Sequence, residues 1–403
     1  MTNKLFRVGI VTAVMIVLFV LFPDVLVPSL EDVPEPPEAM AEFIRFQLPP
    51  GFTANVFATD LSNVRDLERD PNGTIIASLT KDGTIVTVTD VDRDGVADET
   101  LILAEGLNNP HGISLVCDDT DRAAVCSLYV AETDKVSEYH YDPTTREAVF
   151  VRKIASLPSI GDHQIRGLLY DPDKHSLFVA IGSSCEFCQE LDSRYASIQR
   201  FDLETGKLST YATGLYNTVF LAIQPGTKKI WGTEMAHGGS VSDPFPPDEI
   251  NIIEEGKDYG WPYCYGNNLP IEGFDFDDGV VGGFCTTPSR LPSVIDLPAH
   301  SVPLGLTFIP SQGWPAEYAG DLLVIYRGLS ATELKGGYRI VRIEMDATGK
   351  PTGSVKPFVV GFDDASGEPL DRPVDLHAET DGTLFISSDL FGRIYRVSLK
   401  TGP

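Results

Sequence analysis

The stretch "GDHQIRG" (161–167) contains the residue best suited to proton transfer, His163, which stands between Asp162 and Gln164. An imidazole titrates close to neutral pH and can therefore act as a general base. An apolar run follows the stretch, which predicts a turn that leads into a strand. The histidine is then either a structural residue of that turn or a proton acceptor at the mouth of a site. The choice depends on what the fold places beside it.

The acidic run "DVDRDGVADE" (90–99) offers oxygen ligands for a metal. Its aspartates occupy positions one, three, five and nine of a loop: Asp90, Asp92, Asp94 and Asp98. Together with Gly95 at position six, the first three match the start of an EF-hand calcium loop. Position twelve is Leu101 instead of a glutamate, so the EF-hand is incomplete. A structural calcium site and a plain acidic hairpin turn both fit this pattern.

The six cysteines fall in three local pairs: Cys117 with Cys126, Cys185 with Cys188, and Cys264 with Cys285. An even number in local pairs is typical of disulfides in exported proteins. The C-x-x-C spacing at 185–188 also fits a redox motif or half of a zinc site. A zinc site needs a second pair nearby and a redox motif needs a thioredoxin-like context, and the sequence offers neither. We therefore predict three disulfides.

Many short strands must position these groups, because the chain after residue 42 has almost no helical periodicity. Apolar runs separated by Asp-Gly, Asn-Gly and Pro turns recur as one unit, and six copies start at residues 63, 109, 163, 217, 303 and 372. A four-stranded unit repeated at this length is a propeller blade, whereas β-sandwiches would not repeat so regularly. We predict an all-β, six-bladed β-propeller over 45–403, with "FTANVFA" (52–58) completing the last blade.

In a propeller, the loop before each inner strand opens onto one end of the central channel. Corresponding positions of the six copies then form a ring: Arg65, His111, His163, Asn217, Leu304 or Pro303, and Arg372. Arg327 and Asp389, which follow or end the second strands of blades five and six, add to the rim. Histidines and arginines at one mouth favour the general-base interpretation of His163.

The insertion 233–300 covers the same face and contains Tyr259, Trp261 and Tyr263. Such flat apolar rings suit stacking on a sugar or a cofactor ring. They also close the edge of a blade, and for Trp261 we favour that second role.

The N-terminus has the pattern of an export signal. Lys4 and Arg7 precede the apolar run "VGIVTAVMIVLFVLF" (8–22). Residues 1–30 are predicted to be a signal peptide or a membrane anchor, since cleavage and retention both fit, and 31–44 a Pro-rich linker. The folded part is then extracytoplasmic.

The charge balance excludes several classes of partner. Lys and Arg number 31 against 58 Asp and Glu, a net charge of −27. Such a surface repels phosphate backbones, so no nucleic acid partner is expected, and a neutral small molecule suits it better. An anionic ligand requires a local cluster of cations.

Several motifs in order resemble the glucose/sorbosone dehydrogenase family over about residues 45–400: "GFTANVFATDL", "NPHGI", "HQIRGLLYDPDKHSLFVAIGSSCEFC", "PPDEINIIEEGKDYGWPYC", "LPAHSVPLGLTF" and "RPVDL…DGTLFISSDLFGRIYRV". Members of this family are extracytoplasmic six-bladed propellers that use pyrroloquinoline quinone and calcium. The resemblance implies oxidation of a sugar or polyol CH–OH group, with hydride transfer to the quinone and an external electron acceptor.

Residue by residue, the resemblance implies that His163 is the base. It implies that the cofactor is held by Asn217, Arg327 and Arg372, with Gln164 and Tyr216 beside them. Calcium would sit on backbone carbonyls around His237, Gly238 and Gly239. Because the quinone carries three carboxylates, fixed arginines suit it chemically.

Three departures from the family pattern concern this site. Tyr216 precedes Asn217 where the family has arginine, Ser183 stands where an aspartate orients the base, and "YRGLSATE" replaces the usual blade-five loop. A missing charged hydrogen bond costs about 1.5–3 kcal/mol. Two alternatives therefore stay open, a non-catalytic binding propeller, which Tyr216 favours, and a calcium-dependent lactonase-type hydrolase.

Overall fold

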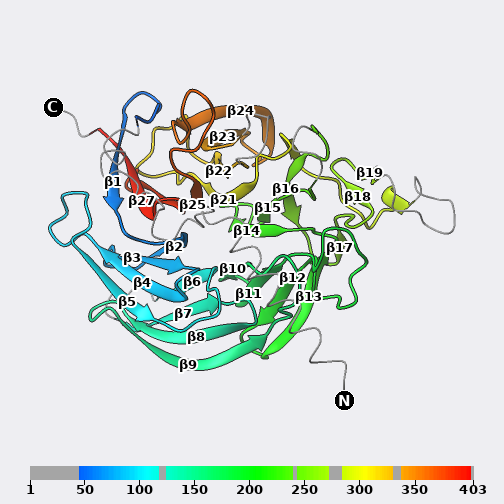
Figure 1. Cartoon of the computed structure of the whole chain (residues 1–403), viewed down its shortest axis with the longest axis horizontal. Coiled ribbons are helices and arrows are strands. Elements are labelled where there is room, and N and C mark those ends of the chain that lie inside the picture. The colour runs from blue at the N-terminus through cyan, green and yellow to red at the C-terminus, as the bar shows by residue number, and fades with distance from the viewer. Residues whose placement is uncertain (1–44, 118–123, 239–242, 272–283, 330–336, 401–403) are drawn as a thin grey trace, which may run out of the picture. The chain divides into compact units, whose positions relative to one another are not determined.

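Each of the six sequence repeats forms an antiparallel sheet, and the sheets are arranged around a common axis (Figure 1). The computed structural model describes residues 45–117, 124–238, 243–271, 284–329 and 337–400. The inner strands contact one another in the order β2, β6, β10, β14, β21 and β25, and β25 returns to β2. The predicted all-β, six-bladed propeller is thus confirmed.

The strands of the first three blades follow the repeat in order. Blade 1 contains β2 (Val64–Arg69), β3 (Ile75–Leu79), β4 (Thr84–Thr89) and β5 (Glu99–Ala104). Blade 2 contains β6 (Ile113–Val116), β7 (Cys126–Ala131), β8 (Lys135–Asp142) and β9 (Glu147–Ser156). Blade 3 contains β10 (Arg166–Asp171), β11 (Ser176–Ile181), β12 (Ser197–Asp202) and β13 (Lys207–Thr213), with β17 (Lys257–Asp258) added in parallel.

The other three blades follow the same scheme with one long insertion. Blade 4 contains β14 (Thr218–Ile223), β15 (Ile230–Glu234), β16 (Asp248–Ile253) and β20 (Ile295–Leu297). Blade 5 contains β21 (Pro303–Phe308), β22 (Leu322–Tyr326), β23 (Arg339–Met345) and β24 (Pro351–Val360). Blade 6 contains β25 (Pro373–Ala378), β26 (Leu384–Ser388), β27 (Arg393–Leu399) and β1 (Phe52–Ala58). The hairpin of β18 (Cys264–Tyr265) and β19 (Leu269–Pro270) lies in the insertion before β20.

The first strand of the folded part closes the ring. β1 pairs antiparallel with β27, with Phe52 opposite Leu399, as the sequence predicted. Phe57 of β1 packs edge to face on Phe385 of β26, with ring centroids 4.9 Å apart. Both rings belong to the apolar cluster between blades 6 and 1. A sheet this narrow buries its faces against neighbouring blades, and closure protects the edge of β27.

Four inner strands carry bulges, and the bulges of β2 and β25 turn carboxylates toward the next blade. The register shifts after the first residue of β2, β14, β21 and β25, and a bulge re-aims the side chains it contains. Asp66 Oδ2 accepts the Ile113 amide of blade 2, and Asp375 Oδ2 accepts the Leu67 amide of blade 1, both at 2.9 Å. Burial, and then the negative charge of Asp375, raises the pKa of Asp66. Burial is also the main cause that raises the pKa of Asp375, to about 6.

All three predicted disulfides are present: Cys117–Cys126, Cys185–Cys188 and Cys264–Cys285. The C-x-x-C pair is therefore not a free dithiol or a zinc half-site. The signal or anchor (1–30) and the linker (31–44) lie outside the described residues. Within the described ranges, no helix has the length and apolar character needed to span a membrane.

Candidate active site

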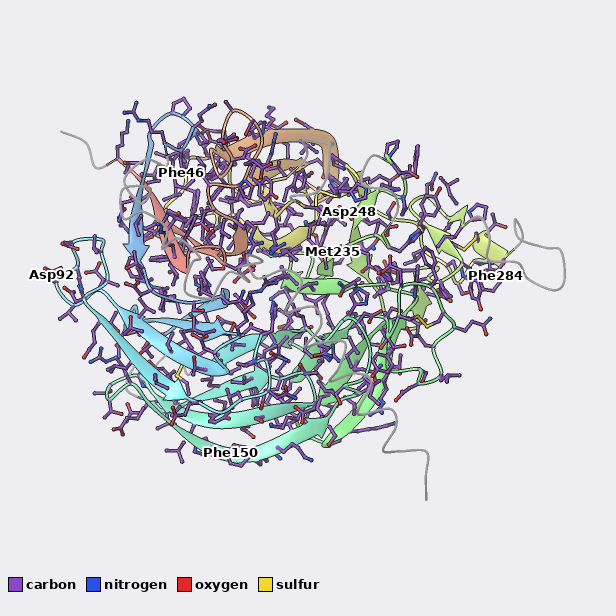
Figure 2. All side chains as sticks on the ribbon, viewed as in Figure 1. Phe46, Asp92, Phe150, Met235, Asp248 and Phe284 are labelled. Carbon is purple, nitrogen blue, oxygen red and sulfur yellow. A yellow bond between two sulfur atoms is a disulfide. The ribbon has the colours of Figure 1, made fainter. Side chains whose placement is uncertain are left out.

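A cavity of about 270 Å³ opens where the loops enter the inner strands of blades 3 and 4. Its lining comes from four blades: Arg65, Asp162, His163, Gln164, Ile165, Asn217, Val219, Met235, Val302, Leu304 and Arg327. Figure 2 shows Met235 toward the centre of the ring, at the inner part of blade 4. Positions separated by 262 residues of sequence thus share one cavity, and four predicted site residues are among them, namely His163, Gln164, Asn217 and Arg327.

The ring of His163 is held in one tautomer. Nδ1 lies 2.8 Å from the carbonyl oxygen of Ser183, which can only accept a hydrogen bond. Nδ1 therefore carries the proton of the neutral ring, and Nε2 has the free lone pair that a base requires. Gly182 permits this approach, because a Cβ there would lie 2.8 Å from the His163 Cβ and 2.7 Å from Asn217 Oδ1. The edge of the Tyr216 ring packs at the other side, with centroids 4.7 Å apart.

Three arginines from three blades surround the carboxylate of Asp389. Arg65 Nη1 donates to Oδ2 at 2.7 Å, Arg327 Nη2 to Oδ2 at 3.1 Å, and Arg372 Nε to Oδ1 at 2.9 Å. Burial raises the pKa of Asp389, but the three guanidinium groups outweigh it and hold the pKa below its usual range. We call these four residues the arginine cluster. It carries two positive charges in excess, in a chain whose net charge is −27.

The arginine cluster has capacity for a further anion. Burial, opposed by Asp389, lowers the pKa of Arg65 to about 10, so its guanidinium stays charged at neutral pH. Arg65 Nε is buried and has no hydrogen-bond partner among the described residues. Arg327 lines the cavity, whereas Arg372 lies in the cluster without lining it. Fixed cations with unused donors suit a carboxylate ligand.

Tyr216 and His237 lie behind this cavity, around a smaller one of about 20 Å³. Tyr216 Oη donates to Glu186 Oε2 at 2.7 Å, and Glu186 Oε1 accepts the Gly238 amide. Burial, and then the bond to Glu186, raises the pKa of Tyr216. Trp261 packs on Tyr216 with centroids 4.4 Å apart, which agrees with the closing role favoured for it. A neutral tyrosine thus stands where the family places a cation.

The predicted calcium positions separate into two places. His237 lines the smaller cavity, whereas Gly238, the next residue, does not, and burial lowers the pKa of the His237 ring; Gly239 falls outside the described residues. In the acidic loop, the carboxylates of Asp90, Asp92 and Asp98 lie within 4.8 Å of one another, while Asp94 instead accepts the Val96 amide at 2.8 Å. Figure 2 shows Asp92 at the outer edge of the molecule, far from the axis.

Other predicted ring positions have different surroundings. His111 is fully buried instead of open to the mouth, and its ring packs on Phe220 with centroids 5.1 Å apart. Burial, and then the charge of Arg65, lowers the pKa of His111 well below its usual value. Glu234 lies beneath the site, where its Oε1 accepts the Asn217 amide at 3.0 Å.

The sequence did not indicate Glu186, which lies in the loop closed by Cys185 and Cys188, or Glu190, which follows that loop. Glu190 accepts hydrogen bonds from Ser183 and Ser184, directly behind the base. The only available signal was their place within or two residues beyond a C-x-x-C pair. No spacing rule assigns contacts to acids in such a loop.

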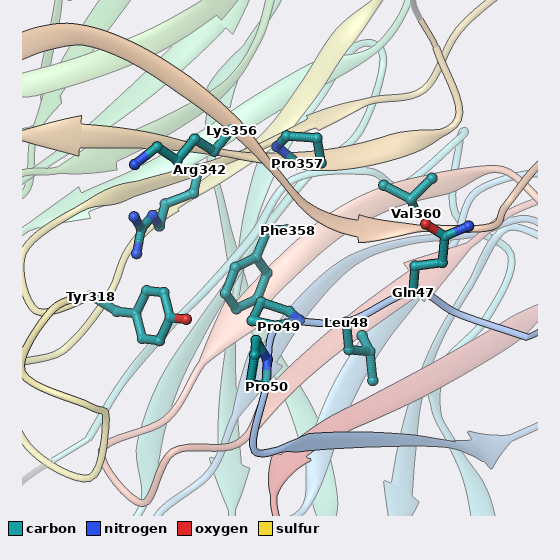
Figure 3. Close-up of a pocket in the computed structure, with 10 residues that line it drawn as sticks. All are labelled: Gln47, Leu48, Pro49, Pro50, Tyr318, Arg342, Lys356, Pro357, Phe358 and Val360. Carbon is teal, nitrogen blue, oxygen red and sulfur yellow. The ribbon is translucent and has the colours of Figure 1, made fainter.

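A further cavity, of about 320 Å³, lies between the chain that enters β1 and blade 5 (Figure 3). Its cations, Arg342 and Lys356, both pair with Glu344. Its described lining contains no histidine or acid that could act as a base. This cavity is therefore a poorer candidate for proton transfer than the cavity at His163.

A family model described as TrAA12-like matches residues 46–400. A pyrroloquinoline quinone-dependent sugar dehydrogenase of Hypocrea jecorina is 25% identical over 370 residues, which cover 78% of this chain and 77% of that protein. An AA12 carbohydrate-active enzyme of Trichoderma reesei superimposes with a TM-score of 0.75 at 20% identity, covering 89% of this chain and 99% of that one. The PQQ domain of the Coprinopsis cinerea pyranose dehydrogenase gives 0.72 at 17%, covering 88% and 97%.

These matches extend over nearly all of the folded part. They confirm the resemblance to sugar dehydrogenases that the ordered motifs indicated, and the structural matches confirm the fold. The chain belongs to the TrAA12-like family.

Proposed function

We propose that this protein is an extracytoplasmic quinoprotein that oxidises a CH–OH group of a sugar or polyol. One observation carries the proposal: a histidine with a free Nε2 and an arginine cluster with excess positive charge meet at one cavity. A hydrolase of neutral lactones has no use for such a cluster. A dehydrogenase that holds an anionic redox cofactor does.

The residues present fit pyrroloquinoline quinone. Arg327 and Asn217 line the cavity, and Arg65 adds a buried, unpartnered Nε. Arg372 does not line the cavity, so its positive charge would attract the anionic cofactor from the edge of the arginine cluster without direct contact. When bound, the quinone supplies a two-electron acceptor that takes hydride from carbon.

The role of His163 follows from its tautomer. Nε2 would accept the proton of the substrate hydroxyl as the carbon that carries it is oxidised to a carbonyl. The imidazolium is stabilised because Nδ1–H keeps its bond to Ser183 O. Asp162 and Gln164 are exposed at the entrance, where sugar hydroxyls would meet them.

Calcium fits less fully. The Gly238 carbonyl, 3.5 Å from His237 Nδ1, would be one oxygen ligand, and calcium typically takes six to eight. There it would polarise a carbonyl as a Lewis acid. The outer loop of Asp90, Asp92 and Asp98 is proposed as a structural site. Electrons would then leave to an external acceptor, and residues 1–30 would provide export or anchoring.

The experiment is reconstitution of the purified chain with quinone and calcium, followed by dye reduction over a panel of aldoses and polyols. Dye reduction that needs both quinone and sugar is expected. Lactone opening with calcium alone would favour the hydrolase. If the quinone does not bind at all, a binding propeller is favoured, as the exchange of arginine for Tyr216 suggests.

A further inference from the structure

The base of this site contacts a peptide group where a carboxylate would be expected. His163 Nδ1 donates to the carbonyl of Ser183, at 2.8 Å. That carbonyl belongs to the peptide bond between Ser183 and Ser184. The amide of the same peptide group, Ser184 N, donates to Glu190 Oε1, also at 2.8 Å. The imidazole and the carboxylate are therefore bonded to opposite ends of one peptide unit.

Glu190 is tied to this peptide unit by more than one bond. Its Oε1 also accepts from Ser183 Oγ at 2.5 Å, and its Oε2 accepts from Ser184 Oγ at 2.6 Å. Hydrogen bonds to an ionised acceptor are stronger than neutral ones. A peptide whose N–H donates to a carboxylate has a more negative carbonyl oxygen, so its next hydrogen bond strengthens as well.

The loop is held in place on both sides. The Ser183 side chain is fully buried, and its amide donates to Tyr216 O at 2.6 Å. The Asp162 amide donates to Ser184 O at 3.1 Å, which joins the loop of the base to the loop of the peptide. The disulfide Cys185–Cys188 spans the turn between Ser184 and Glu190. These contacts fix the peptide in the orientation that meets Nδ1.

Other charged or titratable groups face His163 from the surrounding elements: Asp162 on its own loop, Arg166 at the start of β10, Tyr216 before β14, Arg65 on β2 and Arg327 after β22. Arg166 is occupied by the carbonyls of Pro158, His163 and Ile165. In the described part of the chain, no carboxylate is bonded directly to Nδ1 of His163.

We infer that Glu190 is a positioning residue that acts on His163 through the Ser183–Ser184 peptide. It takes the place of the aspartate that Ser183 replaces, one peptide unit further away. The carboxylate strengthens the acceptor for Nδ1–H, fixes the tautomer with Nε2 free, and stabilises the imidazolium. This inference rests on the proposed role of His163 as the base.

The direct test is nitrogen-15 NMR of histidine-labelled protein without any cofactor, with His163→Gln assigning the signal. In Glu190→Gln, the titration midpoint of His163 should fall by on the order of half a pH unit, because a negative charge that favours the imidazolium is lost. Asp192→Asn is the matched control, since Asp192 pairs with Arg194 and not with the peptide. An unchanged midpoint in Glu190→Gln, or an equal shift in the control, would overturn the inference.

Activity gives a second readout that a purely structural role would not produce. In the reconstituted enzyme, Glu190→Gln should lower kcat roughly tenfold and move the acidic limb of the kcat/KM profile to lower pH, with KM little changed. If Glu190→Gln unfolds at too low a temperature to assay, Glu190→Asp is the second variant, because it keeps the negative charge but moves it away from the peptide. The titration midpoint of His163 should then lie between those of wild type and a chain without the charge. A wild-type midpoint in Glu190→Asp would contradict an action of Glu190 through the Ser183–Ser184 peptide. An inactive wild type with a shifted NMR midpoint in Glu190→Gln would reject the proposed function alone.

Discussion

At the scale of single residues, the proposed chemistry depends on which nitrogen of His163 is free. Because Ser183 O fixes the proton on Nδ1, Nε2 is the atom that meets the substrate. The sequence indicated His163, Asn217 and Arg327 by their places in the repeat and by family resemblance. It did not indicate Glu186 or Glu190, because their contacts depend on how one short loop folds back on itself.

His163→Gln keeps a hydrogen-bond donor but removes the base. We expect kcat to fall by about 10²-fold or more, while the affinity for quinone stays the same. Stopped-flow reduction of the reconstituted enzyme measures the first and calorimetric titration the second. Wild-type turnover in this variant would exclude His163 as the base.

Arg327→Ala removes one cation that both lines the cavity and belongs to the arginine cluster. Loss of a charged hydrogen bond should weaken quinone binding by about tenfold to a hundredfold. Arg152→Ala is the control, because Arg152 is an exposed arginine on β9 that pairs with Glu138. Equal dissociation constants for the two variants would remove the cluster from cofactor binding.

Glu234 gives a test of pH dependence. Burial raises its pKa to about 8 in the folded chain, so this site keeps a proton that the unfolded chain loses near its ordinary pKa of about 4.3. The free energy of unfolding therefore falls as pH rises through this window. In Glu234→Gln, which does not titrate, the melting temperature relative to wild type should rise from pH 5 to pH 8. Glu147→Gln, at an exposed acid, should show a flat difference; the same flat result in Glu234→Gln would contradict the assignment.

At the scale of elements, the sequence predicted the blades well, because turns and apolar runs recur at a regular interval. It did not predict the bulges of β2, β14, β21 and β25, since a bulge changes pairing without changing the apolar pattern. The bulges explain why Asp66 and Asp375 meet backbone amides of the next blade. The apolar pattern also did not show that His111, expected at the mouth, is fully buried against Phe220.

The closing strand β1 is the element whose loss is easiest to measure. Phe52 and Phe57 are both buried, and each contributes about 1.5–3 kcal/mol when buried. A chain that starts at residue 60 should melt well below one that starts at residue 45 and should associate through the open edge of β27. Calorimetry and size-exclusion chromatography measure both effects. Equal melting temperatures would contradict closure by β1.

At the scale of the whole molecule, charge distribution sets the ligand class. The chain is strongly acidic, yet Arg65, Arg327 and Arg372 converge from three blades on one aspartate. Only closure of six blades into a ring brings these residues together. Their convergence could be expected from the repeat, but the excess charge could not, because it depends on which side chains pair with Asp389.

The central claim is that the cavity at His163 holds the quinone against the arginine cluster. A crystal structure of the chain soaked with pyrroloquinoline quinone and calcium tests it most directly. We expect the quinone in this cavity, with a carboxylate on Arg327 or Arg65 and the His163 Nε2 facing the space left for substrate. Quinone bound elsewhere on the molecule, or a cavity that stays empty at saturating quinone, would contradict it.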